Sequence, residues 1–131
     1  MIISRTLPVA VACLTLTACG GSGAGKLDEA AKTQIDCLAS KTVVLISDTV
    51  RDGVIAGLQP DQLSDVQSDK TADGLDILET ARLGEGASSY FEFETARRIN
   101  AMQNAIRSAD RDSDDFRTMI ETRTIAETCT F

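Results

Sequence analysis

Residues 27–57, LDEAAKTQIDCLASKTVVLISDTVRDGVIAG, decide the fold of the chain. Apolar or small side chains recur there at intervals of three and four, which predicts one long amphipathic helix. Four apolar residues at 43–46 also suit a strand, but the sequence has no second strand-like run to pair with it. Gly57 fits the end of the helix, and Pro60 fits a stop beyond it. The polar, solvent-facing side is expected to carry Glu29, Lys32, Asp36, Ser40, Ser47 and Arg51.

The rest of the chain shows the same helical spacing in shorter pieces. The expected segments are a short helix at 61–66, a polar turn at 67–73, a short apolar helix at 75–83, a longer helix from Ser88 or Ser89 to about Ala109, and a last helix from Asp112 or Ser113 onward. In the longer helix, Glu94, Arg97 and Arg98 are expected to face water. The sequence therefore predicts an all-α fold, a small antiparallel helical bundle of three main helices plus one or two short ones.

The N-terminal part precedes this helical domain and has the pattern of a secretory signal. A positive charge at Arg5 is followed by an apolar run at 7–17, which has the length of a signal-peptide core. The run ends at Leu16-Thr17-Ala18-Cys19, which resembles the lipobox of bacterial lipoproteins. The resemblance implies cleavage of residues 1–18 and a covalent lipid on Cys19. A flexible Gly-rich tether at 19–26 would then join the lipid to the helical domain at 27–131, which is predicted from the helical spacing. Ordinary cleavage after Ala18 is the alternative, and Cys13 fits the lipobox less well.

The same resemblance implies a location. The residue after the lipidated cysteine steers sorting in that family, and it is Gly20 here rather than the aspartate that retains enterobacterial lipoproteins at the inner membrane. We therefore expect an outer-membrane protein facing the periplasm, with the inner membrane the less favoured location. No segment after Cys19 approaches the roughly 20 apolar residues of a transmembrane helix, so acyl chains alone should hold the protein on the membrane.

Composition limits the possible functions. The chain has 131 residues and a formal charge of −7, and an acidic domain of this kind is repelled by nucleic acid. It has no histidine, so the usual neutral-pH base and the commonest transition-metal ligand are both missing. Asp48 and Asp52 lie one helical turn apart and could share a proton, but two acids at that spacing on a solvated face are common. Ser88 and Ser89 have no activating partner nearby, so we expect no catalytic residues and no enzyme.

Cysteine count predicts a disulfide. Once Cys13 is cleaved away and Cys19 is acylated, Cys37 and Cys129 are the two that remain. A remaining pair in an oxidising compartment usually forms a bond, and this one would join the first helix to the end of the last. Two buried free thiols are the alternative.

Two functions remain after these exclusions. The first is a non-catalytic interaction or structural module without a cofactor, which contacts another envelope protein or a second copy of itself. The second is a calcium-binding domain, because residues 110–121 place acids at positions 1, 3, 5 and 12 of an EF-hand-like loop. Its candidate ligands are Asp110, Asp112, Asp114 and Glu121. Asp115 stands where that loop needs glycine and Arg117 where it needs an apolar residue, so the match is degenerate.

Overall fold

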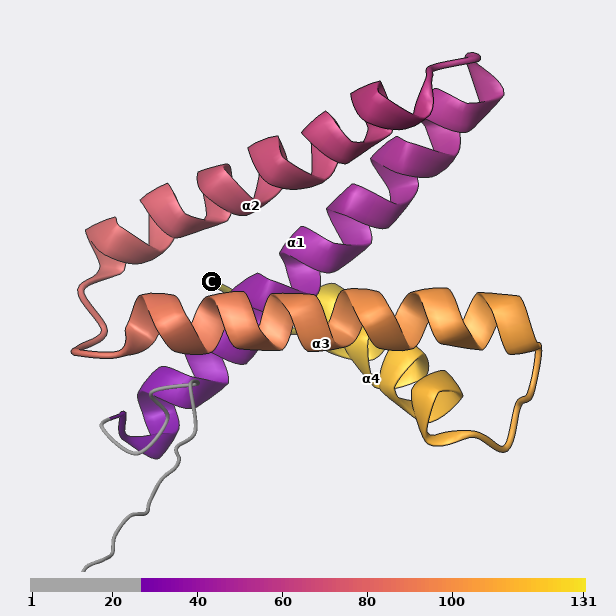
Figure 1. Ribbon diagram of the computed structural model, residues 1–131. Helices are drawn as coiled ribbons and strands as arrows, with labels where there is room; N and C mark the ends of the chain where they lie inside the picture. The colour runs from indigo at the N-terminus through magenta and orange to yellow at the C-terminus, as the bar shows by residue number, and fades with distance from the viewer. Residues whose placement is uncertain (1–26) are drawn as a thin grey trace, which may run out of the picture.

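The computed structural model describes residues 27–131, and this part of the chain consists of helices joined by short loops (Figure 1). The helices are α1 (Glu29–Ile55), α2 (Pro60–Ala81), α3 (Ala87–Ser108) and α4 (Asp114–Thr128). The predicted all-α helical bundle is confirmed, and residues 27–131 contain no strand. Within these residues, no helix is long and apolar enough to cross a membrane. The predicted signal peptide (1–18), the lipidation site Cys19 and the tether (19–26) lie outside the described residues.

Both ends of α1 carry a recognisable cap. At its start the Asp28 side chain accepts a hydrogen bond from the backbone N–H of Ala31 at 2.7 Å, as N-cap residues do. At its end Gly57 adopts the left-handed conformation, with φ +86°. The N–H of Leu58 then donates to the carbonyl of Gly53 at 2.9 Å, which completes a Schellman motif. The predicted end of this helix is therefore confirmed in position and in mechanism.

The second helix corrects the sequence interpretation. The expected short helix at 61–66, polar turn at 67–73 and short helix at 75–83 are one continuous helix, α2. Residues 67–73 contain neither proline nor glycine, so nothing in their covalent structure interrupts helical hydrogen bonding. Their polarity reflects the exposure of this part of α2 rather than a turn. Pro60 occupies the first helical position, as expected, where its missing N–H costs nothing.

The last two helices begin close to the predicted positions. The N-cap of α3 is Gly86, at φ +87°, so neither Ser88 nor Ser89 has the expected capping role. The N-cap of α4 is Ser113, whose hydroxyl accepts from the Phe116 N–H at 3.1 Å.

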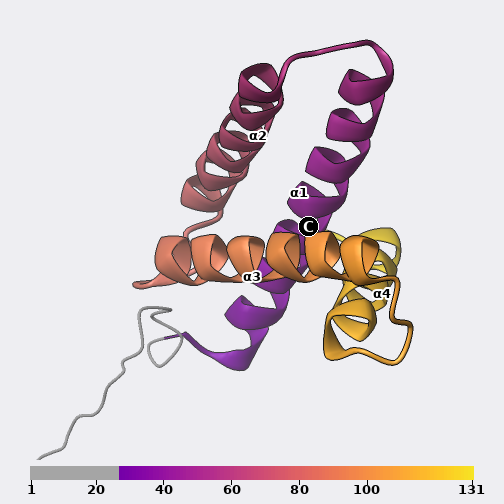
Figure 2. The same cartoon turned by 45° about the vertical axis from the view of Figure 1, so that its right-hand side comes forward.

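The core is built around α1, which packs against each of the other three helices (Figures 1 and 2). One cluster joins α1 to α2 and α3, and its buried members are Leu27, Ala31, Ile35, Leu38, Ala39, Leu78, Ala87 and Phe91. A second, smaller cluster joins α1 to α3 further along, with Val43, Ile46, Ile99 and Met102. Met119 of α4 packs against this second cluster. The helix that begins the described chain is thus the one on which the others depend.

A glycine allows α2 to approach this core. A Cβ atom at Gly74 would lie 2.5 Å from Cζ of Phe91 and 3.1 Å from the Thr42 hydroxyl. Phe91 is fully buried, so its ring has little room to move away. Gly74 therefore sets the distance between α2 and the ring of Phe91.

Away from this contact, α1 and α2 form a projecting arm, which we define as residues 47–55 and 60–73 with the loop between them. Gly53 is the one buried residue of this α1 segment, and no residue of this α2 segment is buried. In both views the joined ends of the two helices extend beyond α3 and α4 (Figures 1 and 2). The arm thus consists of two helical segments that receive little support from the rest of the fold.

Candidate functional site

The end of the arm exposes a group of apolar side chains. Val54 is 60% exposed, Ile55 is 79% exposed and Leu58 is 40% exposed, and all three lie at the turn between α1 and α2. We call these three residues the tip. Asp52 and Asp61 flank the tip in the sequence and are also exposed. The tip therefore presents an apolar surface bordered by negative charge.

An apolar groove of about 560 Å³ lies beside the arm. Three helices line the groove, and each contributes one face over about two helical turns. The lining residues are Val43, Ile46, Ser47, Val50 and Arg51 of α1, Pro60, Leu63, Ser64 and Gln67 of α2, and Ile99, Met102, Gln103 and Ile106 of α3. Arg123 of α4 completes the lining. The volume lies within the range of roughly 300–1,000 Å³ that is usual for small-molecule pockets.

The charged residues that line the groove are both arginines. Arg51 lies 3.7 Å from Asp48 and 3.5 Å from Asp52, so two carboxylates balance its charge. Arg123 reaches Asp48 only at 4.0 Å, and its side chain is partly exposed. Because Asp48 is shared, Arg123 is the less neutralised of the two arginines.

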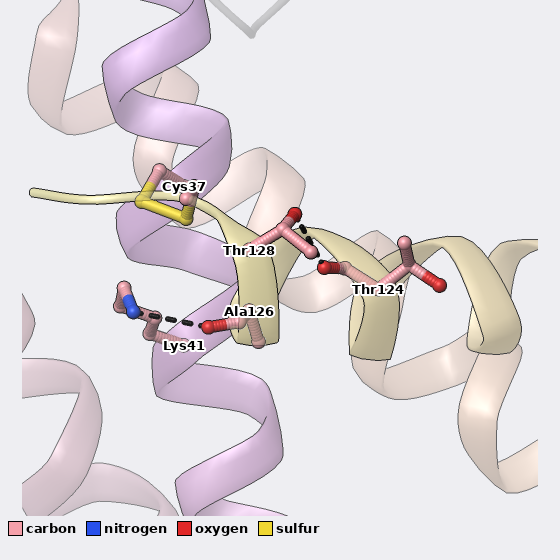
Figure 3. Close-up of a disulfide and its surroundings, with 6 residues drawn as sticks. Cys37, Lys41, Thr124, Ala126 and Thr128 are labelled. Atoms are coloured by element: carbon pink, nitrogen blue, oxygen red, sulfur yellow. Dashed lines mark hydrogen bonds between the residues drawn. A yellow bond between two sulfur atoms is a disulfide. The ribbon is translucent and has the colours of Figure 1, made fainter.

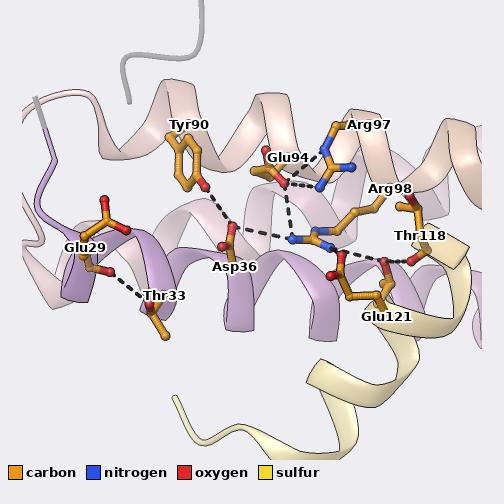
Figure 4. Close-up of polar contacts among 10 residues, drawn as sticks. Glu29, Thr33, Asp36, Tyr90, Glu94, Arg97, Arg98, Thr118 and Glu121 are labelled. Atoms are coloured by element: carbon orange, nitrogen blue, oxygen red, sulfur yellow. Dashed lines mark hydrogen bonds and ion pairs between the residues drawn. The ribbon is translucent and has the colours of Figure 1, made fainter. Parts of the chain in front are cut away.

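A buried ionic network lies where α3 meets α1 and α4 (Figure 4). Its centre is Arg98, whose side chain is only 3% exposed and lies 3.3 Å from Glu94, 3.5 Å from Asp36 and 3.9 Å from Glu121. Arg98 also donates a hydrogen bond to the hydroxyl of the buried Thr122 at 3.3 Å. The network therefore ties three helices together through one guanidinium group.

The same network perturbs its titratable members. Burial raises the pKa of Asp36, and the nearby carboxylate of Glu94 raises it further, against the lowering effects of Tyr90 and Arg98. The Tyr90 hydroxyl donates to Asp36 at 3.0 Å, and burial together with this bond raises the pKa of Tyr90. The hydrogen bond to Glu94 raises the pKa of Arg97. The shifts of Asp36 and Tyr90 follow from packing between α1 and α3, whereas that of Arg97 arises mainly within α3.

Sequence reasoning missed this network. Glu94 and Arg98 were expected to face water but are buried, and so is Ser40, which was assigned to the polar side of α1. Those predictions are wrong because a charged or polar side chain was taken to mean exposure. The signal in the sequence is Glu94 with Arg98 one helical turn later on the face that also carries Phe91, a spacing that permits a pair buried as a unit.

The predicted disulfide is present and fixes α4 to α1 (Figure 3). Cys37 and Cys129 are bonded, with their Cα atoms 5.9 Å apart. Next to it Lys41 donates a hydrogen bond to the backbone oxygen of Ala126 at 3.0 Å. Thr122 is the single fully buried residue of α4, so these covalent and polar contacts hold much of that helix in place.

The structure does not bring the four candidate calcium ligands together. Asp110 accepts from the backbone N–H of Asp112 in the turn before α4, and Asp114 pairs with Arg117 in the first helical turn. Glu121 lies two turns further on and faces Arg98. Among residues 27–131, no group of three such side chains could hold a metal ion. The acids at 110–115 serve as turn and N-terminal helix residues instead.

The residues considered for catalysis have structural partners or lie on the surface. Asp48 and Asp52 each pair with Arg51, so each carboxylate faces a cation rather than the other carboxylate. Ser88 and Ser89 are exposed in the first turn of α3. None of the four residues lines the groove.

Comparisons with known proteins place the chain in no family. No protein-family model, no curated protein and no solved structure matches it. The sequence and the geometry described above are therefore the basis for a functional proposal.

Proposed function

We propose that this protein is a lipoprotein of the bacterial outer membrane that faces the periplasm and acts, without catalysis, by contact with another envelope protein. The lipobox-like segment 16–19 supports the anchor. The projecting arm with its exposed tip supports action by contact, and it is the observation that carries the proposal.

The arm is poorly explained by the stability of the fold alone. Single exposed apolar residues are ordinary on protein surfaces, but the tip groups three within five positions at the end of a hairpin. Isolated helices of the arm's length are marginal in water, and the two helical segments of the arm have little other protein to pack against. A partner that covers the tip would bury these side chains and support both helices. Short helices and grooves of other proteins are common partners for such surfaces.

The position of the tip agrees with this role. The predicted tether joins the domain at residue 27, beside the start of α1, whereas the tip lies at the other end of that helix (Figure 1). A helix of 27 residues spans about 40 Å at 1.5 Å per residue. An anchor at Cys19 would therefore leave the tip well separated from the point of attachment and accessible to proteins of the periplasm or of the opposite membrane.

Site-specific photocrosslinking in intact cells tests the contact. A photoreactive amino acid at Ile55 should give a discrete crosslinked species, because the proposed partner covers the tip. The same amino acid at Glu79, an exposed position near the end of α2 and outside the arm, is the matched control. An identical pattern at both positions, or no crosslink at Ile55, would rule out the tip as the contact.

The anchor is tested separately. Cells that incorporate a tagged fatty acid should label the wild-type protein, and Cys19→Ala should abolish both the label and the association with membranes. If the variant keeps both, the lipobox interpretation is wrong whatever the crosslinking shows.

A further inference from the structure

The groove has the composition of a ligand site, and it differs from the tip in both shape and charge. From these features we propose that the groove binds a single-chain anionic amphiphile, namely a fatty-acid carboxylate. The alkyl chain lies between α1, α2 and α3, and the carboxylate lies at Arg123. This site goes beyond the proposed contact function, because the tip does not contribute a residue to the lining.

The apolar part of the groove matches an alkyl chain. Each of α1, α2 and α3 contributes positions spaced over seven or eight residues, which is about 10–12 Å of helix. A chain of that length would bury most of its methylene groups, each of which contributes to binding by the hydrophobic effect. Met102 lies on the α3 wall, and its unbranched thioether can adapt to chains of different thickness.

The charge of the lining selects the head group. The whole chain is acidic, with a formal charge of −7, yet the charged residues of the lining are Arg51 and Arg123. Arg51 has two carboxylate partners, whereas Arg123 has only the 4.0 Å pair with a shared Asp48. Its guanidinium therefore keeps donors for a ligand carboxylate, and a fork of this kind suits a planar carboxylate. The other polar side chains of the lining are uncharged, so they add no negative charge that would repel the ligand; they are Ser47, Ser64, Gln67 and Gln103.

Methionine methyl NMR of the full chain tests the site. The chain has three methionines, of which Met102 lines the groove and Met119 packs against the core from α4. The protein is labelled at the methionine methyl groups, placed in nanodiscs of zwitterionic lipid, and titrated with laurate. The Met102 signal should shift to saturation, and by more than that of Met119, which packs against the groove-lining cluster but does not itself line the groove. Acetate supplies the head group alone and dodecanol the chain alone, so both should bind more weakly than laurate.

Three side chains outside the buried core, those of Arg123, Ile106 and Ile120, provide two test variants and a control. Arg123→Gln should weaken laurate binding about three- to tenfold, near the lower end for a charge-assisted hydrogen bond because the side chain is partly exposed, and it should leave dodecanol unchanged. Ile106→Glu places a carboxylate on the lip of the groove, where the native side chain is 69% exposed, and should reduce laurate binding further. Ile120→Glu makes the same change on α4, outside the lining, and should have no effect.

Three outcomes would overturn the proposal. Equal affinity for dodecanol and laurate would show that the carboxylate does not contribute to binding. Unchanged laurate binding in Arg123→Gln would remove the role of that residue. A Met102 shift that depends on protein concentration alone, without laurate, would show a second copy of the chain in the groove.

Discussion

Removal of the disulfide should strongly destabilise the domain. Cys37 and Cys129 are 92 residues apart, and closing a loop of that length lowers the entropy of the unfolded chain. The chain-entropy relation gives about 4.6 kcal/mol at 25 °C for such a loop, as an upper figure. A domain of this size has a total stability of roughly 5–15 kcal/mol. Even at the upper end of that range, the bond would contribute up to about three-tenths of the free energy of unfolding.

Urea unfolding of the full chain in mild detergent, followed by circular dichroism, measures this contribution. The Cys37→Ser/Cys129→Ser variant should unfold at a lower urea concentration, by several kcal/mol, and reductant should bring the wild type to the same midpoint. The Cys13→Ser/Cys19→Ser variant is the control, because it keeps the bond and should respond to reductant as the wild type does. Hydrogen exchange should show the largest loss of protection in α4, which buries one residue fully.

A difference below about 1 kcal/mol would refute this reasoning. Since the loop entropy is fixed by sequence separation, such a result would mean that the unfolded chain is already compact or that the bond strains the native state.

Four further predictions concern the core, the network and the loop before α4. Gly74→Ala should lower stability by up to about 2 kcal/mol in thermal unfolding, because an overpacking cost of about 1–3 kcal/mol against a fixed ring exceeds the roughly 1 kcal/mol that alanine gains over glycine in a helix. Ultraviolet titration of Tyr90, the one tyrosine, should show a midpoint above the usual value of about 10, and Asp36→Asn should lower it. Because Tyr90 keeps its hydroxyl proton to a higher pH in the folded state than in the unfolded chain, the free energy of unfolding should fall as the pH rises above about 10. Arg98→Met should lower the free energy of unfolding in urea by about 3–5 kcal/mol, because the carboxylates of Asp36 and Glu94 would lose their buried cation. A change near zero would show that these carboxylates are hydrated in the variant. Isothermal titration with Ca²⁺ should give no heat attributable to residues 110–121, and saturable binding lost in an Asp110→Ala variant would contradict this.

The sequence was sufficient for those features that depend on local spacing. The long first helix, its end at Gly57 and the start of the last helix near Asp112 or Ser113 follow from periodicity and from the chemistry of helix ends. The disulfide followed from counting the cysteines that would remain after the predicted processing. Each of these predictions needed information from only a few positions.

The errors concern contacts between distant segments. The polar stretch at 67–73 was assigned to a turn because polarity marks exposure in turns and in exposed helices alike. The burial of Arg98 also depends on Asp36, 62 positions earlier, and on Glu121, 23 positions later, so the local Glu94–Arg98 spacing permits a buried pair but does not by itself show that one forms. The groove likewise exists only where three helices meet.

The uneven burial of α1 and α2 has a consequence for how this protein can diverge. Substitutions along the buried face of α1 disturb contacts with three helices at once, so few alternatives preserve the fold. In α2 only Gly74 and Leu78 are buried, and the fully exposed positions of this helix can change at little cost. The exposed surface of the arm can therefore be remodelled by mutation while the rest of the domain stays constant, and a new binding preference can arise without a new fold.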